Sequence, residues 1–193
     1  LGGWIAVTAG WQAIFMFLIA FALLCGGLVW RVIPETLPVE RRSGLDPVSV
    51  FRAYAALLRN GRFMVPALTG GFVLASMFAF TTGSPFVFMG RFGFSEQQYG
   101  LVFGCTALGL MVGAQVNRLG LRRFSVTAML GAALCVNLAG AVALFAVVGT
   151  ERAFVLMLPL WFVVASLGMI GGNAAAIAMA ASGRNAGTAS ALI

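Results

Sequence analysis

Five long apolar runs constrain the fold of this chain more than any other feature. A helix needs about 20 mostly apolar residues to cross the hydrocarbon core of a bilayer. Charges and helix breakers between the runs mark where each span ends. The expected spans are residues 11–30, 63–82, 96–116, 126–148 and 153 to about 174.

Composition agrees with a membrane fold. Of the 193 residues, 61% are apolar and 9% are charged, whereas about a quarter of the residues in a soluble domain are charged. Shorter apolar stretches at residues 1–9 and 187–193 resemble the end and the beginning of further spans. The chain opens at Leu1 without a charged leader, so we expect it to be a piece of a longer protein.

The chain has a net charge of +7, and all of its positive charge comes from arginine, because it has twelve arginines and no lysine. Clustered arginine is typical of nucleic-acid binding, but here every arginine lies in or beside a gap between apolar runs, so we expect no nucleic-acid partner. Alternate gaps hold most of them: Arg31, Arg41, Arg42, Arg52, Arg59 and Arg62 in one, Arg118, Arg122 and Arg123 in another, and Arg184 in a third. The intervening gaps hold only Arg91 and Arg152. Cytoplasmic loops carry the positive excess, so the first three gaps are predicted to face the cytoplasm.

The longest of these gaps, residues 31–62, divides the apolar runs into two unequal groups. Within it, residues 46–60 read as a short amphipathic helix, with Asp46 as its cap and Pro47 in the first turn. Its apolar face would carry Phe51, Tyr54, Leu57 and Leu58, and its arginines could meet lipid phosphates. A solvated linker with chance periodicity is the alternative.

The start of the third run carries a local signal for a helix N-terminus. Ser95 is in position to act as N-cap with Gln98 at N3, the arrangement of a capping box. Phe94 and Tyr99 occupy the positions of a hydrophobic staple. We therefore expect this helix to begin near Glu96.

The interiors of the spans lack the groups that catalysis requires. No Asp, Glu, Lys or Arg lies well inside a full span, and the chain has no histidine. Intramembrane ionisable residues mark proton relays and reactive centres, so we expect neither an enzyme nor a proton site in these residues. Cys25, Cys105 and Cys135 lie apart in apolar runs without metal-ligand spacing, so we expect them to pack, and we expect no metal or other cofactor.

Neutral polar and aromatic side chains gather near the outer end of the second full span, around Pro85. A proline there would break the helix and leave backbone carbonyls that must face protein or a water-filled cavity. This predicts an apolar substrate cavity. The candidate substrate-binding residues are Met77, Phe80, Thr81, Ser84 and Phe86, with Trp161, Met169 and Asn173 farther along. The alternatives are that the span ends at Thr82 before a surface turn, and that polar groups such as Asn137 and Asn173 bond neighbouring helices.

Glycines recur at four-residue spacing in the third full span, Gly100 with Gly104 and Gly109 with Gly113. Small residues at this spacing allow helices in membranes to approach closely. Plain packing is the first interpretation, and a smooth surface on which helices slide is the second.

Several short motifs resemble those of the major facilitator superfamily, and most of all its Bcr/CflA group of bicyclomycin-resistance exporters. Residues 1–3 resemble the tail of the antiporter motif in helix five, and residues 10–15 resemble a Gly-Trp-Arg-x-x-Phe sequence with Gln12 in place of Arg. Residues 34–37, Pro-Glu-Thr-Leu, resemble the exit of helix six. Residues 84–87 and 186–192 resemble stretches of the drug exporters after helix seven and at the start of helix eleven.

Residues 113–123 resemble the second copy of the superfamily's Gly-x-x-x-Asp-Arg-x-Gly-Arg-Arg loop, which implies a conformational gating loop. Its matched positions are Gly113, Asn117, Arg118, Gly120 and Arg122. Asn117 stands where the family has Asp, and Leu121 stands where it has Arg. These departures weaken any charge-relay role for this copy.

The resemblance implies the major facilitator superfamily fold in part, from helix five to helix eleven. Residues 1–30 would end the N-terminal helix bundle, residues 31–62 would form the central cytoplasmic loop, and residues 63–193 would belong to the C-terminal bundle. It also implies a monomeric, proton-coupled exporter of small amphiphilic substrates in the bacterial inner membrane, with its coupling acid in earlier helices. An importer of a polar nutrient and a non-transporting membrane subunit are the alternatives.

Overall fold

The computed structural model describes residues 10–32, 47–183 and 186–193, and every regular element in these ranges is a helix. The elements are α2 (Trp11–Val32), α3 (Pro47–Arg59), α4 (Gly61–Pro85), the π-helix η2 (Phe86–Arg91), α5 (Glu96–Gly120), α6 (Val126–Ala146), α7 (Ala153–Ala181) and α8 (Ala186–Ser190). Five stretches are long and apolar enough to cross a membrane: Gln12–Val32, Gly61–Arg91, Glu96–Gly120, Val126–Ala146 and Ala153–Ala181. The predicted all-α membrane fold with five full spans is confirmed.

The chain forms two compact units, Leu1–Leu45 and Asp46–Ile193. The first contains α2, whose membrane-length stretch buries none of its residues. The boundary falls inside the loop predicted at residues 31–62. All the packing described below lies within the second unit.

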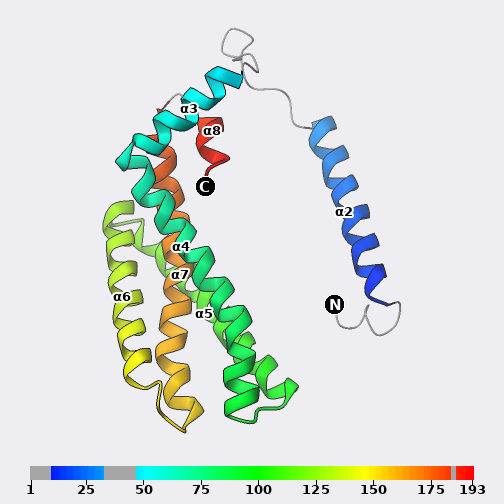
Figure 1. The fold of residues 1–193 in the computed structure, drawn as a ribbon, viewed down its shortest axis with the longest axis vertical. Coiled ribbons are helices and arrows are strands. Elements are labelled where there is room, and N and C mark those ends of the chain that lie inside the picture. The colour runs from blue at the N-terminus through cyan, green and yellow to red at the C-terminus, as the bar shows by residue number, and fades with distance from the viewer. Residues whose placement is uncertain (1–9, 33–46, 184–185) are drawn as a thin grey trace. The chain divides into compact units, whose positions relative to one another are not determined.

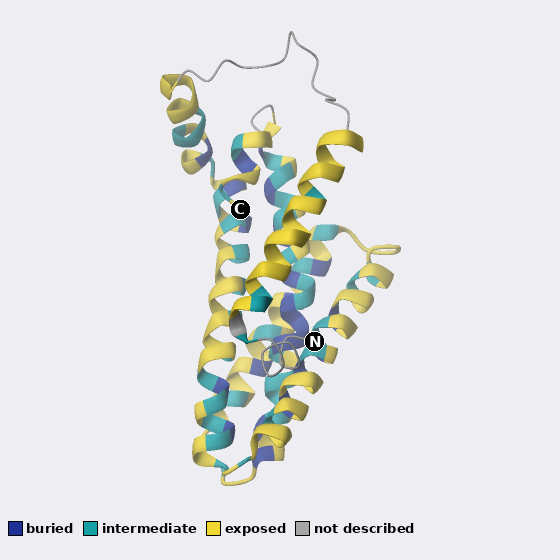
Figure 2. Cartoon of the chain, turned by 90° about the vertical axis from the view of Figure 1, so that its right-hand side faces the viewer, coloured by how far each residue is buried: buried dark blue, intermediate teal, exposed yellow. Residues whose placement is uncertain are grey.

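Helix α7 is the centre of the second unit (Figure 1). Helices α4, α5 and α6 each pack extensively against it. Its span is the most buried of the five, and buried residues lie where the helices face one another, while most outward faces are exposed (Figure 2). A run of small residues, Ala165 and Gly168 among them, lets its neighbours approach.

Glycines bring the backbones of α5 and α7 close together. A Cβ atom at Gly113 would overlap the carbonyl oxygen of Ala165, and one at Gly168 would lie 2.5 Å from the carbonyl oxygen of Leu110. By contrast, a Cβ atom at Gly100 or Gly104 would meet nothing within 4 Å. Of the two glycine pairs predicted to pack, only Gly109 with Gly113 lies in a helix contact within the described residues.

The predicted start of the third span is confirmed in detail. The Ser95 hydroxyl accepts the backbone N–H of Gln98 at 3.3 Å, and the Gln98 side chain accepts the backbone N–H of Ser95 at 2.9 Å. Helix α5 therefore begins at Glu96 with a complete capping box. Phe94 and Tyr99 both pack against the buried cluster around Phe88.

The short helix predicted in the long loop is also present, as α3, so the linker alternative is wrong for residues 47–59. Leu57 is buried against Phe63, Ala178 and Ala189, and Tyr54 is partly buried. Phe51 and Leu58 are 74% and 54% exposed. One part of the predicted apolar face therefore packs against the bundle, and the other part is exposed. The predicted cap, Asp46, lies outside the described residues.

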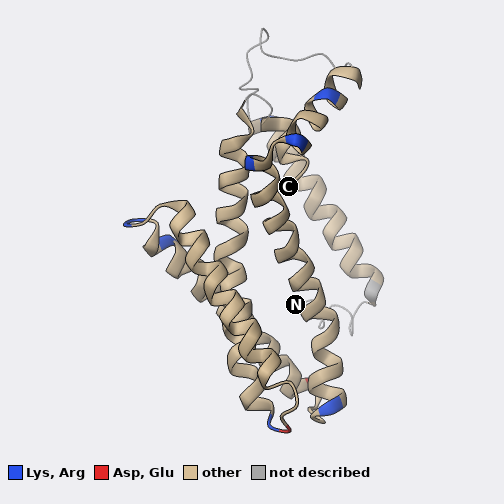
Figure 3. Cartoon of the chain, turned by 60° about the vertical axis from the view of Figure 1, so that its left-hand side comes forward, with Lys and Arg blue, Asp and Glu red and all other residues tan. Residues whose placement is uncertain are grey.

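Charged side chains of the membrane-length helices lie at the helix ends, and the helix bodies between them are uncharged (Figure 3), whereas Arg52 lies within the short helix α3. Arg118 is in the last turn of α5, Arg91 ends η2, and Glu151 and Arg152 directly precede α7. This is the distribution that a bilayer requires, because ions at its centre are costly.

The charge distribution predicts the orientation of the full-length protein. In a background without Cys25, Cys105 and Cys135, a single cysteine at Arg122 should be protected in intact cells from a membrane-impermeant maleimide, whereas one at Arg152 should react. Both positions are exposed. Reaction after membrane permeabilisation is the control for Arg122. The reverse labelling pattern would show that the predicted cytoplasmic face is the outer one.

Candidate functional site

Helix α4 continues through Pro85 instead of ending before it. The α-helix runs to Pro85 and is followed without interruption by the π-helix Phe86–Arg91, so the whole stretch Gly61–Arg91 has the length of a span. The alternative that the span ends at Thr82 before a surface turn is therefore wrong. Proline has no amide hydrogen to continue the helical ladder, and the change to π-helix follows directly after it. Short π-helical segments often occur at functional sites.

The backbone bonds around Pro85 show how the helix adapts. The Phe86 N–H donates to the Gly83 carbonyl, and the Phe92 N–H donates to the Val87 carbonyl, five residues back, at 3.2 Å. The Thr82 hydroxyl donates to the Phe78 carbonyl at 2.7 Å. Backbone carbonyls on both sides of Pro85 thus accept hydrogen bonds from backbone N–H groups or from a hydroxyl of the same helix.

The Ser84 side chain makes its hydrogen bond to the neighbouring helix α5. Its hydroxyl lies 2.9 Å from the hydroxyl of Tyr99 on α5, and Ser84 itself is buried. Four residues earlier, Phe80 stacks on Phe103 of α5, with ring centroids 5.8 Å apart. These two contacts hold the region before Pro85 against α5.

A cavity of about 440 Å³ lies between α4 with η2, α6 and α7, and we call it the α4–α6–α7 cavity. Its lining is almost entirely apolar, and its volume is in the range of small-molecule sites. The lining residues are Ser76, Ala79, Phe80, Gly83, Ser84, Val87, Phe88, Arg91, Leu144, Val148, Leu156, Leu160, Val163, Val164 and Leu167. Two of the predicted site residues, Phe80 and Ser84, therefore lie together on one cavity.

Arg91 lines the same cavity and was not among the predicted site residues. Its guanidinium donates to the carbonyl oxygens of Val148, at 2.6 Å, and Thr150, at 2.9 Å, and lies 5.4 Å from the centroid of the Phe92 ring. These carbonyls follow the C-terminus of α6, where a cation is favourable. In the sequence, the residue carried only a topological signal, as one of two arginines on the predicted outer side.

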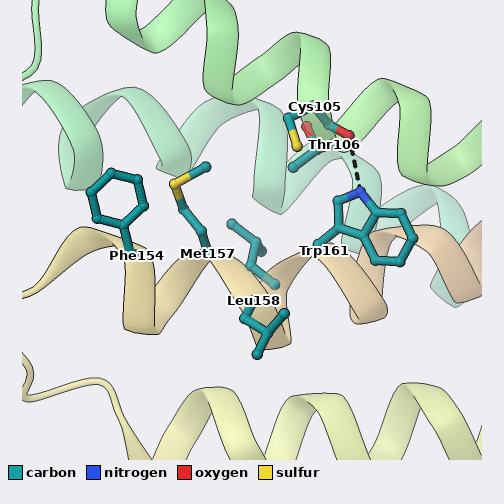
Figure 4. Close-up of a pocket in the computed structure, with 7 residues that line it drawn as sticks. Cys105, Thr106, Phe154, Met157, Leu158 and Trp161 are labelled. Carbon is teal, nitrogen blue, oxygen red and sulfur yellow. Dashed lines mark hydrogen bonds between the residues drawn. The ribbon is translucent and has the colours of Figure 1, made fainter.

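A second pocket, of about 330 Å³, lies between α5 and α7 (Figure 4). The Trp161 indole N–H donates to the Cys105 carbonyl at 3.1 Å. Gly109 makes room for this ring, because a Cβ atom there would lie 2.9 Å from the indole nitrogen. Leu160 lines both this pocket and the α4–α6–α7 cavity, so α7 forms a wall shared by the two.

The other predicted substrate-binding residues do not lie on either pocket. Met77 and Met169 pack against the buried cluster of Ala133, Leu167 and Ile170. Thr81 and Phe86 are exposed, Phe86 to 79%, and the Thr81 hydroxyl donates to the Met77 carbonyl at 2.7 Å. The eight candidates therefore occupy several faces of the bundle.

Asn173 is buried, at 2% exposure, and pairs with Asn117 of α5. Each side-chain amide donates to the other's oxygen, at 3.2 and 2.7 Å. Asn137 of α6 similarly donates to the Ser166 hydroxyl of α7 at 2.8 Å. Both asparagines thus bond a neighbouring helix, which was the alternative to a cavity role.

The predicted gating loop lies at the end of α5. Gly113 forms the close contact with α7, Asn117 pairs with Asn173, and Gly120 faces Met129 of α6. Arg118 and Arg122 are exposed. Asn117 occupies the position where the superfamily motif has Asp, and here it forms an uncharged amide pair. The gating role of the loop stays a prediction.

The cavity gives a prediction for two phenylalanines on one helix segment. Phe80→Ala should weaken the binding of a small apolar dye to the full-length protein, because this ring lines the α4–α6–α7 cavity. Phe86→Ala removes the same side chain from an exposed position and should weaken binding less. Binding is measured by fluorescence titration of the purified protein in nanodiscs, with empty nanodiscs subtracted. A larger loss from Phe86→Ala would place the binding surface on the exposed face of the helix.

Uncharged spans around a central helix, with charge only at their ends, define a polytopic α-helical membrane protein. Residues 1–193 match the family model described as Major Facilitator Superfamily, and the chain belongs to that superfamily. No solved structure matches the chain significantly.

Three relatives from bacteria support the same assignment. The chain is 29% identical to the "Uncharacterized MFS-type transporter YdgK" of Bacillus subtilis, over 96% of this chain and 46% of the relative. It is 27% identical to a "Bicyclomycin resistance protein homolog" of Haemophilus influenzae, over 100% and 49%. It is 28% identical to the "Multidrug transporter MdfA" of Edwardsiella ictaluri, over 55% and 27%. The chain thus spans about half the length of the first two relatives.

Proposed function

We propose that the full-length protein is a secondary active transporter that exports small amphiphilic drugs in exchange for protons. The observation that carries this proposal is the similarity of the whole chain to a protein named as a bicyclomycin resistance homolog. The similarity to proteins named as multidrug transporters supports it. We place the protein in the bacterial inner membrane, as a monomer without a tightly bound cofactor.

The physical character of the bundle supports an amphiphilic substrate. The α4–α6–α7 cavity and the α5–α7 pocket offer aromatic rings and aliphatic side chains to a ligand. The Ser84 hydroxyl and the Trp161 N–H, which could have bound a polar nutrient, already have partners within the bundle. A polar substrate needs several free hydrogen-bonding groups to replace its water. Import of such a nutrient is therefore the weaker interpretation.

In transporters of this architecture, substrate binds near the midplane between two halves, and access alternates as one half rocks against the other. In this proposal residues 63–193 contribute the C-terminal half and its share of the site. The spans of this chain carry no carboxylate between their end turns. The residue that exchanges the proton would therefore lie in a part of the protein outside residues 1–193.

Drug accumulation in cells tests the proposal. Cells lacking their own multidrug exporters and expressing the full-length protein should retain less of a lipophilic fluorescent drug than cells with an empty vector. Addition of an uncoupler should abolish the difference. Equal retention for every compound of a broad panel, with the protein present in the membrane, would contradict drug export.

A further inference from the structure

Among the described residues that line the α4–α6–α7 cavity, Arg91 is the one that carries a charge. Apart from Ser76 and Ser84, the other lining residues are apolar or glycine. Arg91 itself is exposed at the end of η2, so water screens part of its charge, but the described lining holds no second charge that would compete with it for a ligand. The charge state of a ligand should therefore affect its binding here.

The guanidinium is fixed but not neutralised. Its two described hydrogen bonds go to neutral carbonyl oxygens, of Val148 and Thr150, and the Phe92 ring is also uncharged. Arginine carries five N–H donors, so these two bonds leave others for a ligand. Among the described residues, no Asp or Glu side chain forms an ion pair or hydrogen bond with Arg91.

We infer that Arg91 makes the α4–α6–α7 cavity selective for amphiphiles with an anionic or a neutral, hydrogen-bond-accepting head, and unfavourable for lipophilic cations. The apolar part of the ligand occupies the space beside Phe80 and Leu160, and its head lies toward the guanidinium. This inference rests on the proposed export of amphiphiles and specifies its substrate class. It assigns a specificity role to a residue that the sequence marked only for topology.

Two ions of the same shape and opposite charge test the inference. Tetraphenylborate and tetraphenylphosphonium each carry four phenyl rings around one central atom. Their binding to the purified full-length protein in nanodiscs is measured by titration calorimetry, with empty nanodiscs subtracted. The ratio of the two affinities should shift toward the cation by about tenfold in Arg91→Gln, because one nearby positive charge is lost. It should stay within about twofold of the original in Arg91→Lys, which keeps the charge but loses the forked geometry.

An equal shift in Arg91→Gln and Arg91→Lys, or no shift in either, would overturn the inference. A matched pair of glycine variants tests the location of the site. Gly83→Leu should weaken binding of both ions, because Gly83 lines the cavity and a Cβ atom there meets nothing within 4 Å. Gly104→Leu, with equally open space on α5 and no part in the cavity, should leave binding unchanged. Equal binding losses in both variants, or no loss in Gly83→Leu, would place the ions elsewhere and contradict the inference.

Binding and transport separate this inference from the proposed function. If charge-selective binding is observed but no drug leaves the cells, the export proposal fails and the site remains. If drugs are exported but Arg91→Gln leaves the affinity ratio unchanged, only the inference about Arg91 fails.

Discussion

Gly113→Ala should lower the stability of the full-length protein more than any other single methyl addition in this bundle. The added Cβ atom would overlap the carbonyl oxygen of Ala165, which belongs to the backbone of α7 and cannot rotate away. The two helices would have to separate at this contact, and the neighbouring contact of Gly168 with the Leu110 carbonyl would open with it. Overpacking of a tight interior costs about 1–3 kcal/mol and occasionally more. We expect Gly113→Ala to lower the free energy of unfolding by about 3 kcal/mol or more.

The measurement is thermal denaturation of the purified protein in detergent, followed by size-exclusion chromatography. Gly104→Ala is the matched control, on the same helix and nine residues away, because its Cβ atom would meet nothing within 4 Å. It should leave the melting temperature unchanged or raise it slightly, since alanine is the better helix former. Equal melting temperatures for the two variants would show that α5 and α7 do not meet at Gly113.

Asn173→Leu should also lower the stability of the full-length protein strongly. The substitution removes the partner of Asn117 and leaves a partly buried amide without its bonds, which costs about 1–3 kcal/mol. Hydrogen bonds between helices in membranes contribute only about 0.6 kcal/mol on average. Most of the expected loss therefore comes from the orphaned amide rather than from the bond itself.

The double variant Asn117→Leu/Asn173→Leu separates these two contributions. It leaves no unpaired amide, so its melting temperature should be higher than that of Asn173→Leu and closer to that of the original protein. A double variant less stable than either single one would mean that the amide pair contributes more than this account allows.

The positions of the spans could be predicted from the sequence because they depend on local properties. The length of an apolar run decides whether a helix can cross the bilayer. The capping box at Ser95 needs only residues within one turn. Both were confirmed by the structure. The sequence predicted a change in the helix at Pro85, but it could not show that the backbone would continue from there as a π-helix.

The candidate site was less predictable because side-chain partners come from distant parts of the chain. Asn173 is bonded to a residue 56 positions away, and Arg91 to carbonyls 57 and 59 positions away. Neighbours within one segment can also face different ways, as Phe80 and Phe86 do. In an almost wholly apolar helix, hydrophobic periodicity is too weak to reveal which face meets other helices.

Uptake into inverted membrane vesicles measures proton-coupled drug export without interference from other steps in the cell. A proton gradient, acidic inside, is imposed across the membrane of vesicles that contain the full-length protein. The uptake of a lipophilic drug is then followed over time. Proton-coupled export predicts uptake above that of vesicles without the protein, and collapse of this excess when an uncoupler dissipates the gradient. Excess uptake that persists with the uncoupler would contradict proton coupling. No excess uptake for any compound of a broad panel would contradict export itself.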